Sequence, residues 1–351
     1  MKKLLAVMLV ALTVTSMVFA GGEGDSKGGK GPLVAFICKD LSQEWFVGTS
    51  GAMKAAATAR GASDVLMFDC AMNPDKYMTA LDTVISRKVD VLIVCPPDQN
   101  LSQITVDRCK AAGIKVFADD DPLIDGSGKL IAPALALDAY KVGEGIGVYL
   151  AEYYAKNNMA ANAATTGFML MNMPEVSSCV PRSLGAKDFF LKGVPAFDAK
   201  KLIVADYDGT SEKGFNVASA TITANPAITH WIVMAPNDEG AQGATRALEQ
   251  AGKDKNAIVA GVGGYLAKDE FKKAYSCFKA TAYIDPVLDG TLAGNAAMDW
   301  ILNGKEAYTD NKKTATPDQI AQFGTAYGFY PFSATMIDAS NYKEIMGASA
   351  N

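Results

Sequence analysis

Residues 89–118, VDVLIVCPPDQNLSQITVDRCKAAGIKVFA, decide the fold class of this 351-residue chain. Two short, mainly apolar runs, Val89–Val94 and Ile114–Ala118, each with one charged residue at its second position, enclose a longer segment, Leu101–Ala112. A short run in which nearly every residue is apolar is typical of a strand that is covered on both faces of its sheet. The segment between the runs has the length of a helix. The stretch therefore predicts one βαβ unit, in which the two strands run parallel.

The same alternation continues along the chain in both directions and then starts a second time. Leu33–Cys38 and Asp64–Asp69 are predicted strands upstream, and after an apolar run at Leu130–Leu137 the alternation resumes as far as Leu302. The sequence therefore predicts an α/β protein with two doubly wound parallel-sheet lobes. The other predicted strands are Thr166–Met171, Lys201–Ala205, Trp231–Ala235, Ala257–Val262 and Ala282–Ile284, and the other predicted helices are Glu44–Arg60, Pro74–Arg87, Ala139–Lys156, Ser178–Leu191, Glu212–Ala224, Glu239–Ala251 and Pro286–Leu302.

The residues after Leu302 are too few for a third domain. They comprise a polar stretch and an apolar tail, YGFYPFSATMI, which must return to the two lobes. Exchange of the chain between lobes predicts a hinge made of several parallel connections. We expect residues 32–137 and 286–314 to form the first lobe, and residues 138–285 and 315–351 to form the second.

The first twenty residues have the pattern of a secretory signal peptide. Lys2 and Lys3 precede an apolar run, and Val18 and Ala20 are small residues at the −3 and −1 positions of a cleavage site. The run is short and interrupted, which disfavours the alternative of an N-terminal membrane anchor. Residues 21–31 contain six glycines and predict a flexible leader. We therefore expect a periplasmic protein whose signal peptide is removed after about Ala20.

Composition excludes several classes of function. The chain has 33 Lys and Arg against 38 Asp and Glu, a formal charge of −5, whereas nucleic-acid binders are usually basic. Its one histidine, His230, begins a predicted strand and is expected to be structural. The six cysteines fit no zinc or redox spacing, so we expect mostly buried thiols, with one disulfide pair left open. These counts predict no nucleic-acid partner, no metal and no cofactor.

Polar side chains follow the predicted strands at the points where the strands end. In open α/β sheets, ligands bind beyond the carboxyl ends of the strands. Carboxylates, amides and cations beside an aromatic face suit a sugar, because each hydroxyl donates and accepts and the C–H face of the ring packs on an aromatic side chain. These residues are Lys39, Asp40, Trp45, Asp69, Asp98, Asp119–Asp121, Asn172, Asp206, Asp208, Asn237, Asp238 and Asp285.

Seven segments, four of them at these strand ends, resemble the L-arabinose-binding protein family, which comprises type I periplasmic solute receptors of ABC importers. The similarity spans about Leu33–Leu302. It implies two Rossmann-like lobes that are joined by a three-strand hinge and close over one pyranose. It also implies a monosaccharide ligand, an ABC permease in the inner membrane as partner, and a monomeric protein. The segments are VAFICKDLSQEWF, VLIVCPPDQN, KVFADDDPLID, KVGE, PRSLGA, HWIVMAPND and RALEQAG.

The resemblance assigns four positions of the first lobe to the sugar. It implies that Lys39 hydrogen-bonds ring hydroxyls, that Trp45 covers an apolar patch of the ring, and that Asp120 accepts from the anomeric hydroxyl. Leu137 falls where the family has a methionine near a crossover. Trp45 as a plain core residue, and Asp119–Asp121 as a solvated turn or a calcium ligand set, are the alternatives; the chain lacks the D-x-D-x-D-G pattern of a calcium loop.

Four more positions come from the second lobe. The resemblance implies that Arg182 forks onto the ring oxygen and a neighbouring hydroxyl, and that Asn237 bonds a hydroxyl through its amide. Val176 and Ser178 are expected to line the wall. Asn237 and Asp238 are also residue types that favour the start of a helix. We expect Asp238 to act as the N-cap of the predicted helix Glu239–Ala251.

The chain departs from the family pattern at three positions. Gln43 replaces a carboxylate near Trp45, Gly263 replaces an asparagine, and Leu266 replaces an acidic residue. Asp289 stands where the family has a histidine and is expected to restore part of the lost polarity. We therefore expect a neutral pyranose, with L-arabinose first and D-galactose, D-fucose, D-xylose or D-glucose as competitors.

Two other functions compete with solute binding. An α/β enzyme is disfavoured, because the chain has no G-x-S-x-G elbow and no G-x-G-x-x-G phosphate loop. Paired carboxylates can hydrolyse glycosides, but no residue is marked as a general acid. A sensor that presents its closed form to a chemoreceptor or kinase would share the fold and the site, and this alternative stays open.

Overall fold

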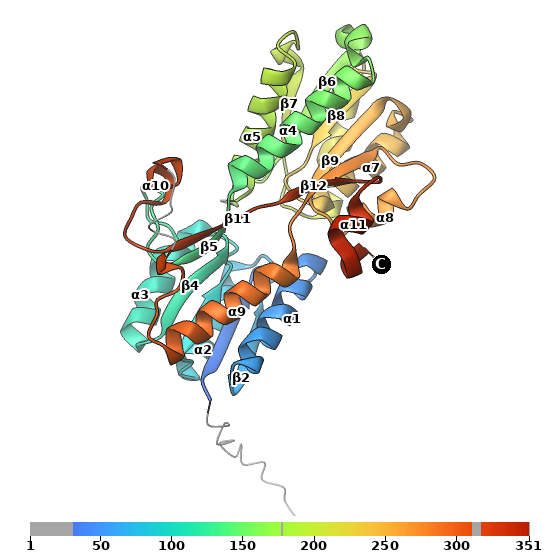
Figure 1. The fold of residues 1–351 in the computed structure, drawn as a ribbon. Helices are drawn as coiled ribbons and strands as arrows, with labels where there is room; N and C mark the ends of the chain where they lie inside the picture. Colours follow the sequence, from blue (N-terminus) through green and yellow to red (C-terminus); the bar gives the residue numbers. More distant parts are fainter. Residues whose placement is uncertain (1–30, 177, 311–316, 351) are drawn as a thin grey trace, which may run out of the picture.

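The computed structural model describes residues 31–176, 178–310 and 317–350, which form two α/β lobes with a waist between them (Figure 1). Each lobe is built on one six-stranded sheet. The predicted signal peptide, residues 1–20, and the leader as far as residue 30 lie outside the described residues. No helix in the described ranges is long and apolar enough to cross a membrane.

The sheet of the first lobe has the strand order β11-β5-β4-β3-β1-β2, with all neighbours parallel. Helices α1 and α9 pack together, and α2 lies beside α3. The strands are β1 (Leu33–Cys38), β2 (Asp64–Asp69), β3 (Val91–Val94), β4 (Lys115–Asp120), β5 (Ala134–Leu137) and β11 (Phe329–Phe332). The helices are α1 (Glu44–Ala59), α2 (Pro74–Ser86), α3 (Ser102–Ala112), α9 (Pro286–Leu302) and α10 (Pro317–Phe323), with a 3-10 turn at Gln99–Leu101.

The sheet of the second lobe has the order β12-β10-β9-β8-β6-β7, in which only β12 is antiparallel to its neighbour. The strands are β6 (Thr166–Asn172), β7 (Leu202–Asp206), β8 (His230–Met234), β9 (Ala257–Gly263), β10 (Phe278–Tyr283) and β12 (Thr335–Asp338). The helices are α4 (Ala139–Lys156), α5 (Cys179–Gly193), α6 (Ser211–Ala224), α7 (Asp238–Gln250), α8 (Ala267–Phe271) and α11 (Tyr342–Met346), with 3-10 turns at Met159–Thr165, Ala199–Lys201, Asp254–Asn256 and Gly347–Ala350.

The apolar run of β1 explains why the first sheet is covered on both faces. Successive side chains of a strand point to opposite faces. Val34 and Phe36 belong to the core that contains Met53 of α1, whereas Ala35 and Ile37 belong to a second core on the other face. The strand is apolar throughout because neither face meets water. The predicted pair of doubly wound parallel-sheet lobes is therefore confirmed.

Close helix packing fixes the start of α5. A Cβ added to Gly143 of α4 would lie 2.1 Å from the carbonyl oxygen of Arg182, and a Cβ added to Gly185 would lie 2.2 Å from that of Tyr140. Only glycine allows α4 and α5 to approach this closely. Arg182, which the sequence marked as a ligand residue, is therefore carried on a tightly held helix.

Three connections join the lobes. In the first, β5 leads to α4 through Asp138, and in the second, β10 leads to α9 through Ile284 and Asp285. The third lies between β11 and β12, at Ser333 and Ala334.

The third connection corrects the predicted boundary at residues 314 and 315. Phe329 pairs with Ala134 and Phe332 with Leu137, so the chain remains in the first lobe as far as Phe332. The apolar tail is two strands, one in each sheet.

The six cysteines, which all lie in the described ranges, are buried and unpaired, as expected for most of them. They contribute to the cores as small apolar side chains. The apolar run at Leu130–Leu137 is a strand only in its second half: β5 begins at Ala134, and Leu130 makes an isolated bridge to Ile124.

Candidate ligand-binding site

A pocket lies where the carboxyl ends of the two sheets face each other. Its cavity volume is about 50 Å³, which is room for several water-sized groups at about 10–15 Å³ each. Residues of both lobes and of one crossover line it: Lys39, Gln43, Trp45, Phe46, Met72, Asp120, Met173, Cys179, Arg182, Asn237, Val262, Gly263, Tyr265 and Ile284.

Asp120 lies at the centre of the charged groups. Its Oδ2 atom is 3.1 Å from Lys39 Nζ, in the same lobe, and its Oδ1 atom accepts a hydrogen bond of 3.4 Å from Arg182 Nη2, in the other lobe. The three side chains are between 6 and 8% exposed. Asp120 has a φ of +62°, a left-handed conformation that is uncommon for a residue other than glycine. Such conformations gather at functional sites, where the surrounding structure holds them in place.

Asp121 makes a second bridge between the lobes. Its Oδ1 atom accepts a hydrogen bond of 2.9 Å from the backbone amide of Ser178, and its Oδ2 atom pairs with Lys39. Burial acts to raise the pKa of Asp121, but the positive charge of Lys39 and the hydrogen bonds hold that pKa below its ordinary value. Asp121 is therefore an ionised, structural anchor for closure.

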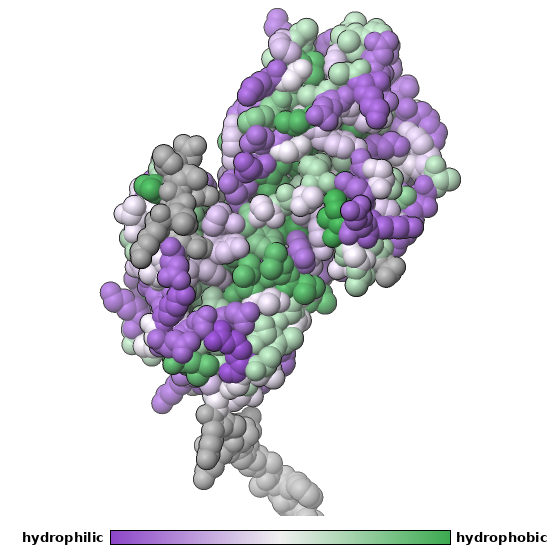
Figure 2. Space-filling view, viewed as in Figure 1, coloured by the Kyte–Doolittle hydropathy of each residue, from purple (hydrophilic) through white to green (hydrophobic). Residues whose placement is uncertain are grey.

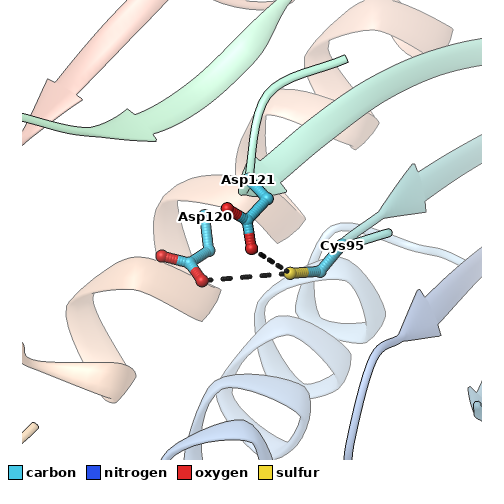
Figure 3. A group of neighbouring side chains, drawn as sticks. All are labelled: Cys95, Asp120 and Asp121. Carbon is cyan, nitrogen blue, oxygen red and sulfur yellow. Dashed lines mark hydrogen bonds between the residues drawn. The ribbon is translucent and has the colours of Figure 1, made fainter. Parts of the chain in front are cut away.

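Cys95, Asp120 and Asp121 form a compact cluster at the ends of β3 and β4 (Figure 3). The thiol of Cys95 lies 3.9 Å from Asp120 and 3.7 Å from Asp121. Burial raises the pKa of this thiol well above its ordinary value, so it stays protonated and is a poor metal ligand. The ammonium group of Lys39 bonds both carboxylates and supplies the positive charge that a metal ion would bring.

Arg182 is positioned from two sides. Its Nη1 atom donates a hydrogen bond of 2.9 Å to the carbonyl oxygen of Pro236, at the end of β8. Its Nε atom is buried and has no hydrogen-bond partner within the described part of the chain. A buried donor without a partner is costly, and a ligand oxygen would satisfy it.

Trp45 serves both the pocket and the hinge. Its Nε1 atom donates a hydrogen bond of 3.1 Å to the carbonyl oxygen of Ile284, at the second connection, and its ring meets Phe46 edge to face with 4.8 Å between centroids. The ring is 7% exposed and lines the pocket. The core role and the lining role, posed as alternatives, are therefore combined in one residue. Lys39 Nζ lies 5.4 Å from the centre of the Phe46 ring.

Asn237, rather than Asp238, caps helix α7. Its Oδ1 atom accepts hydrogen bonds from the amide of Gly240, at 2.8 Å, and from the hydroxyl of Tyr207, and its Nδ2 atom donates to the carbonyl oxygen of Gly209. Asn237 lines the pocket, but much of its amide is already committed to these contacts.

Asp238 does not act as the expected N-cap of α7 but holds a neighbouring loop. It is fully buried and accepts hydrogen bonds from the amides of Gly264, Leu266 and Ala267. It also accepts from the hydroxyl of Thr281. These bonds hold the loop that follows β9 and brings Tyr265 to the pocket.

Tyr265 explains the glycine at position 263. Gly263 has a φ of +133°, and a Cβ added there would lie 2.5 Å from the ring of Tyr265. The Tyr265 hydroxyl bonds both oxygens of Glu239 at 2.8 Å. The space that a side chain at 263 would need is thus filled by an aromatic ring, which no pattern in the sequence indicates.

Glu239 carries a shifted pKa beside this ring. Burial raises the pKa of Glu239 to about 7, the bond from Tyr265 acts in the opposite direction, and the charges of Asp238 and Asp40 add to the rise. Asp40 belongs to the first lobe and Glu239 to the second, so the two carboxylates oppose each other across the cleft.

The structure brings six of the ten predicted ligand residues to the pocket, namely Lys39, Gln43, Trp45, Asp120, Arg182 and Asn237. Leu137 lies in the core near the first connection, and Val176 lines a neighbouring cavity. Ser178 contributes its backbone amide to Asp121.

Asp289 does not line the pocket, which corrects the idea that it restores polarity there. It is buried at the start of α9, and its Oδ2 atom has no hydrogen-bond partner in the described ranges. Burial raises the pKa of Asp289 well above its ordinary value, and the nearby charge of Asp119 raises it further.

A further cavity lies on the hinge side of the ligand pocket. It shares Trp45, Gly263 and Tyr265 with that pocket. Figure 2 shows an apolar patch beside it, over the ends of α1 and α9 nearest the hinge. Val47 and Val287 in these helices are 55% and 52% exposed.

Comparison with known proteins agrees with this geometry. Residues 34–306 match the family described as the periplasmic binding protein domain. An L-arabinose-binding periplasmic protein of an ABC transporter in Azospirillum brasilense is 26% identical over 317 residues, covering 88% of this chain and 91% of that protein. The ribose import binding protein of Bacillus subtilis is 29% identical over 273 residues, covering 76% and 80%.

The fold is shared with solved structures. The Caulobacter myo-inositol binding protein, bound to myo-inositol, matches with a TM-score of 0.73 at 22% identity, covering 90% of this chain and 97% of that chain. The family match spans well over half of the sequence and confirms the resemblance seen at the strand ends. The chain belongs to the periplasmic binding protein family, in its type I sugar-binding branch.

Proposed function

We propose that this protein is the periplasmic solute-binding component of an ABC sugar importer and captures one neutral monosaccharide between its lobes. The observation that carries the proposal is the position of Asp120, between Lys39 of its own lobe and Arg182 of the other. A ligand that bonds these groups touches both lobes at once. It therefore stabilises the closed arrangement over an open one.

The charge balance of the pocket favours a neutral ligand. Lys39 and Arg182 face Asp120 and Asp121, so two cations meet two carboxylates. An added phosphate or carboxylate would leave a charge without a partner, which is costly in a buried site. Sugar hydroxyls donate to Asp120 and accept from Lys39 and Arg182, while Trp45 offers an apolar face to the ring.

L-arabinose is our first choice of sugar. Named relatives at 26 and 29% identity bind arabinose and ribose, which supports a pentose or a related hexose. The ring of Tyr265 takes the place of a polar side chain at position 263. One side of the sugar ring is therefore held by its fit against Tyr265 more than by hydrogen bonds. We expect D-galactose, D-fucose, D-xylose or D-glucose to compete with L-arabinose.

Delivery to an inner-membrane permease completes the proposed role, with the protein acting as a monomer. Presentation of the closed form to a chemoreceptor or kinase would use the same closure and a different surface partner. An enzymatic role has no support from the family, whose members named here are transport proteins. The proposed periplasmic location includes removal of residues 1–20, which mass spectrometry of the mature N-terminus would check.

A thermal-shift screen over pentoses and hexoses, followed by calorimetric titration, tests the proposal. A ligand at about 100 times its dissociation constant adds about 2.7 kcal/mol to the folded state, which such a screen detects. We expect at least one neutral pyranose to bind and to be recovered unchanged. Failure of every neutral sugar to bind would refute the proposal, and turnover of a bound sugar would favour an enzyme.

A further inference from the structure

The cleft contains a second, larger cavity on the side away from the hinge, which we call the mouth cavity. Its volume is about 600 Å³, against about 50 Å³ for the ligand pocket. It is formed by the loops after β2 and β3 in the first lobe and after β6 and β7 in the second. β2 and β7 are the edge strands farthest from the connections in sheet order, which places the cavity at the opening of the cleft.

Two methionines separate the mouth cavity from the ligand pocket. Met72 of the first lobe and Met173 of the second line both spaces, and Met72 packs against the core of the second lobe that contains Met173. Methionine is unbranched and flexible, so it adapts to differently shaped neighbours. The partition between the two spaces is therefore a movable one.

The backbone around both methionines is specialised for this arrangement. Ala71 and Met72 have φ values of +47° and +56°, and the Met72 amide donates to the carbonyl oxygen of Lys39 at 2.6 Å. A Cβ added to Gly209 would lie 2.4 Å from Cε of Met173. Strained conformations persist where the surrounding structure imposes them, and here one places Met72 at the cleft, while the absence of a side chain at Gly209 leaves room for Met173.

The chemistry of the mouth cavity suits a sugar-like group that is neutral or positively charged. Pro97, Pro174 and Tyr207 give it apolar surfaces, on which the C–H face of a ring can pack. Asp98, Glu175, Asp206 and Asp208 offer carboxylate acceptors for hydroxyl or ammonium donors. Among the described residues that line it, none is a lysine or an arginine, so an anionic group would be repelled.

From these contacts we infer that the mouth cavity holds a second group joined to the bound sugar, so that short glycosides, disaccharides above all, are ligands of this protein. The first ring occupies the pocket beside Asp120, and the linkage passes between Met72 and Met173. The second ring then touches both lobes and adds to closure. This inference rests on the proposed function and extends its substrate class from monosaccharides to glycosides.

Calorimetric titration of the full mature chain tests the inference. The probes are the monosaccharide that binds best, its methyl glycosides, and xylobiose, cellobiose, maltose and lactose. We expect at least one glycoside or disaccharide to bind no more than threefold weaker than the monosaccharide. A monosaccharide that binds while every glycoside binds more than a hundredfold weaker would overturn the inference and leave the proposed function intact. Absence of all saccharide binding would refute both.

The variant Glu175→Trp fills the mouth cavity from an exposed position outside the ligand pocket, and Glu175→Gln is its matched control. We expect Glu175→Trp to weaken disaccharide binding at least tenfold and to change monosaccharide binding less than twofold, while Glu175→Gln changes both less than threefold. Equal weakening of both ligands by Glu175→Trp, or no effect on either, would contradict a separate second-ring site.

Discussion

Arg182 and Asp120 come from different lobes and form an ion pair across the cleft, with 3.4 Å between Nη2 and Oδ1. Both side chains are almost fully buried. A buried pair is stable only when further polar partners satisfy its remaining atoms. Lys39 and the carbonyl oxygen of Pro236 supply two of these partners, and the Nε atom of Arg182 still lacks one in the described ranges.

Removal of Arg182 should therefore weaken ligand binding strongly. Loss of a buried hydrogen bond that involves a charge corresponds to about 1.5–3 kcal/mol, so we expect Arg182→Ala to bind sugar about 10- to 100-fold more weakly by calorimetry. Lys187→Ala, a change at the surface of the same helix, is the control and should bind as the wild type does. Binding of Arg182→Ala within about threefold of the wild type would show that the assignment of Arg182 is wrong.

A side chain at position 263 should destabilise the fold. In Gly263→Asn the new Cβ meets the ring of Tyr265 and the backbone keeps a φ of +133°, so we expect the melting temperature to fall by several degrees. In the Tyr265→Ala background the same substitution should lower it less, because the clash is gone. Gly51→Ala in helix α1, where a Cβ meets nothing within 4 Å, is the control and should not lower stability. An equal fall in both backgrounds would contradict the steric explanation.

Stability should depend on pH through Glu239. Its pKa is raised from 4.5 to about 7. The stabilising contribution of its protonated form to the free energy of unfolding is therefore complete below about pH 4.5 and is lost as the pH rises to about 7. We expect the free energy of unfolding, measured in denaturant, to decline across this window by at most about 1.4 kcal/mol per pH unit. Glu239→Gln should remove this decline, whereas Glu152→Gln on the exposed face of α4 should keep it. A wild-type profile identical to that of Glu239→Gln would contradict the assignment.

Asp289 should destabilise the protein at neutral pH. Its carboxyl is buried, and its pKa is raised by burial and by the charge of Asp119. Both carboxylate oxygens of Asp119 also lack hydrogen-bond partners in the described ranges. Asp289→Asn removes the ionisable group at similar size, and with it the cost that a raised pKa implies as the pH rises, so we expect a higher melting temperature at pH 7.5. At pH 5 the gain should be smaller, because the carboxyl is closer to its protonated form. A lower melting temperature at pH 7.5 would show that the ionised carboxylate is stabilising.

Much of the fold could be predicted because its signals are local. The apolar runs of β1, β3 and β4 mark strands buried on both faces, and Pro74 marks the start of the predicted helix Pro74–Arg87, a start that the structure confirms. The third connection could not be found this way. Its position depends on which sheet accepts Phe329–Phe332, a contact with β5 almost 200 residues earlier, as the pairing of Phe329 with Ala134 shows.

The site shows the same division between local and distant information. Lys39, Asp120 and Arg182 follow strands or begin a helix, and those places are visible in the sequence. Tyr265 was missed because its role depends on a loop held by Asp238, and Met72 because its backbone conformation is unusual. Asp289 was misplaced because the resemblance gives its position in the chain but not the packing of α9 against α1.

Closure of the lobes around a sugar is tested most directly by small-angle X-ray scattering of the mature protein with and without a saturating sugar. The structure has closed lobes, joined by Arg182 with Asp120, Ser178 with Asp121, and Lys268 with Glu44. We predict that the radius of gyration falls when sugar is added and that the sugar-bound profile matches this closed structure. An unchanged radius of gyration, with binding confirmed by calorimetry in the same sample, would contradict capture between the lobes.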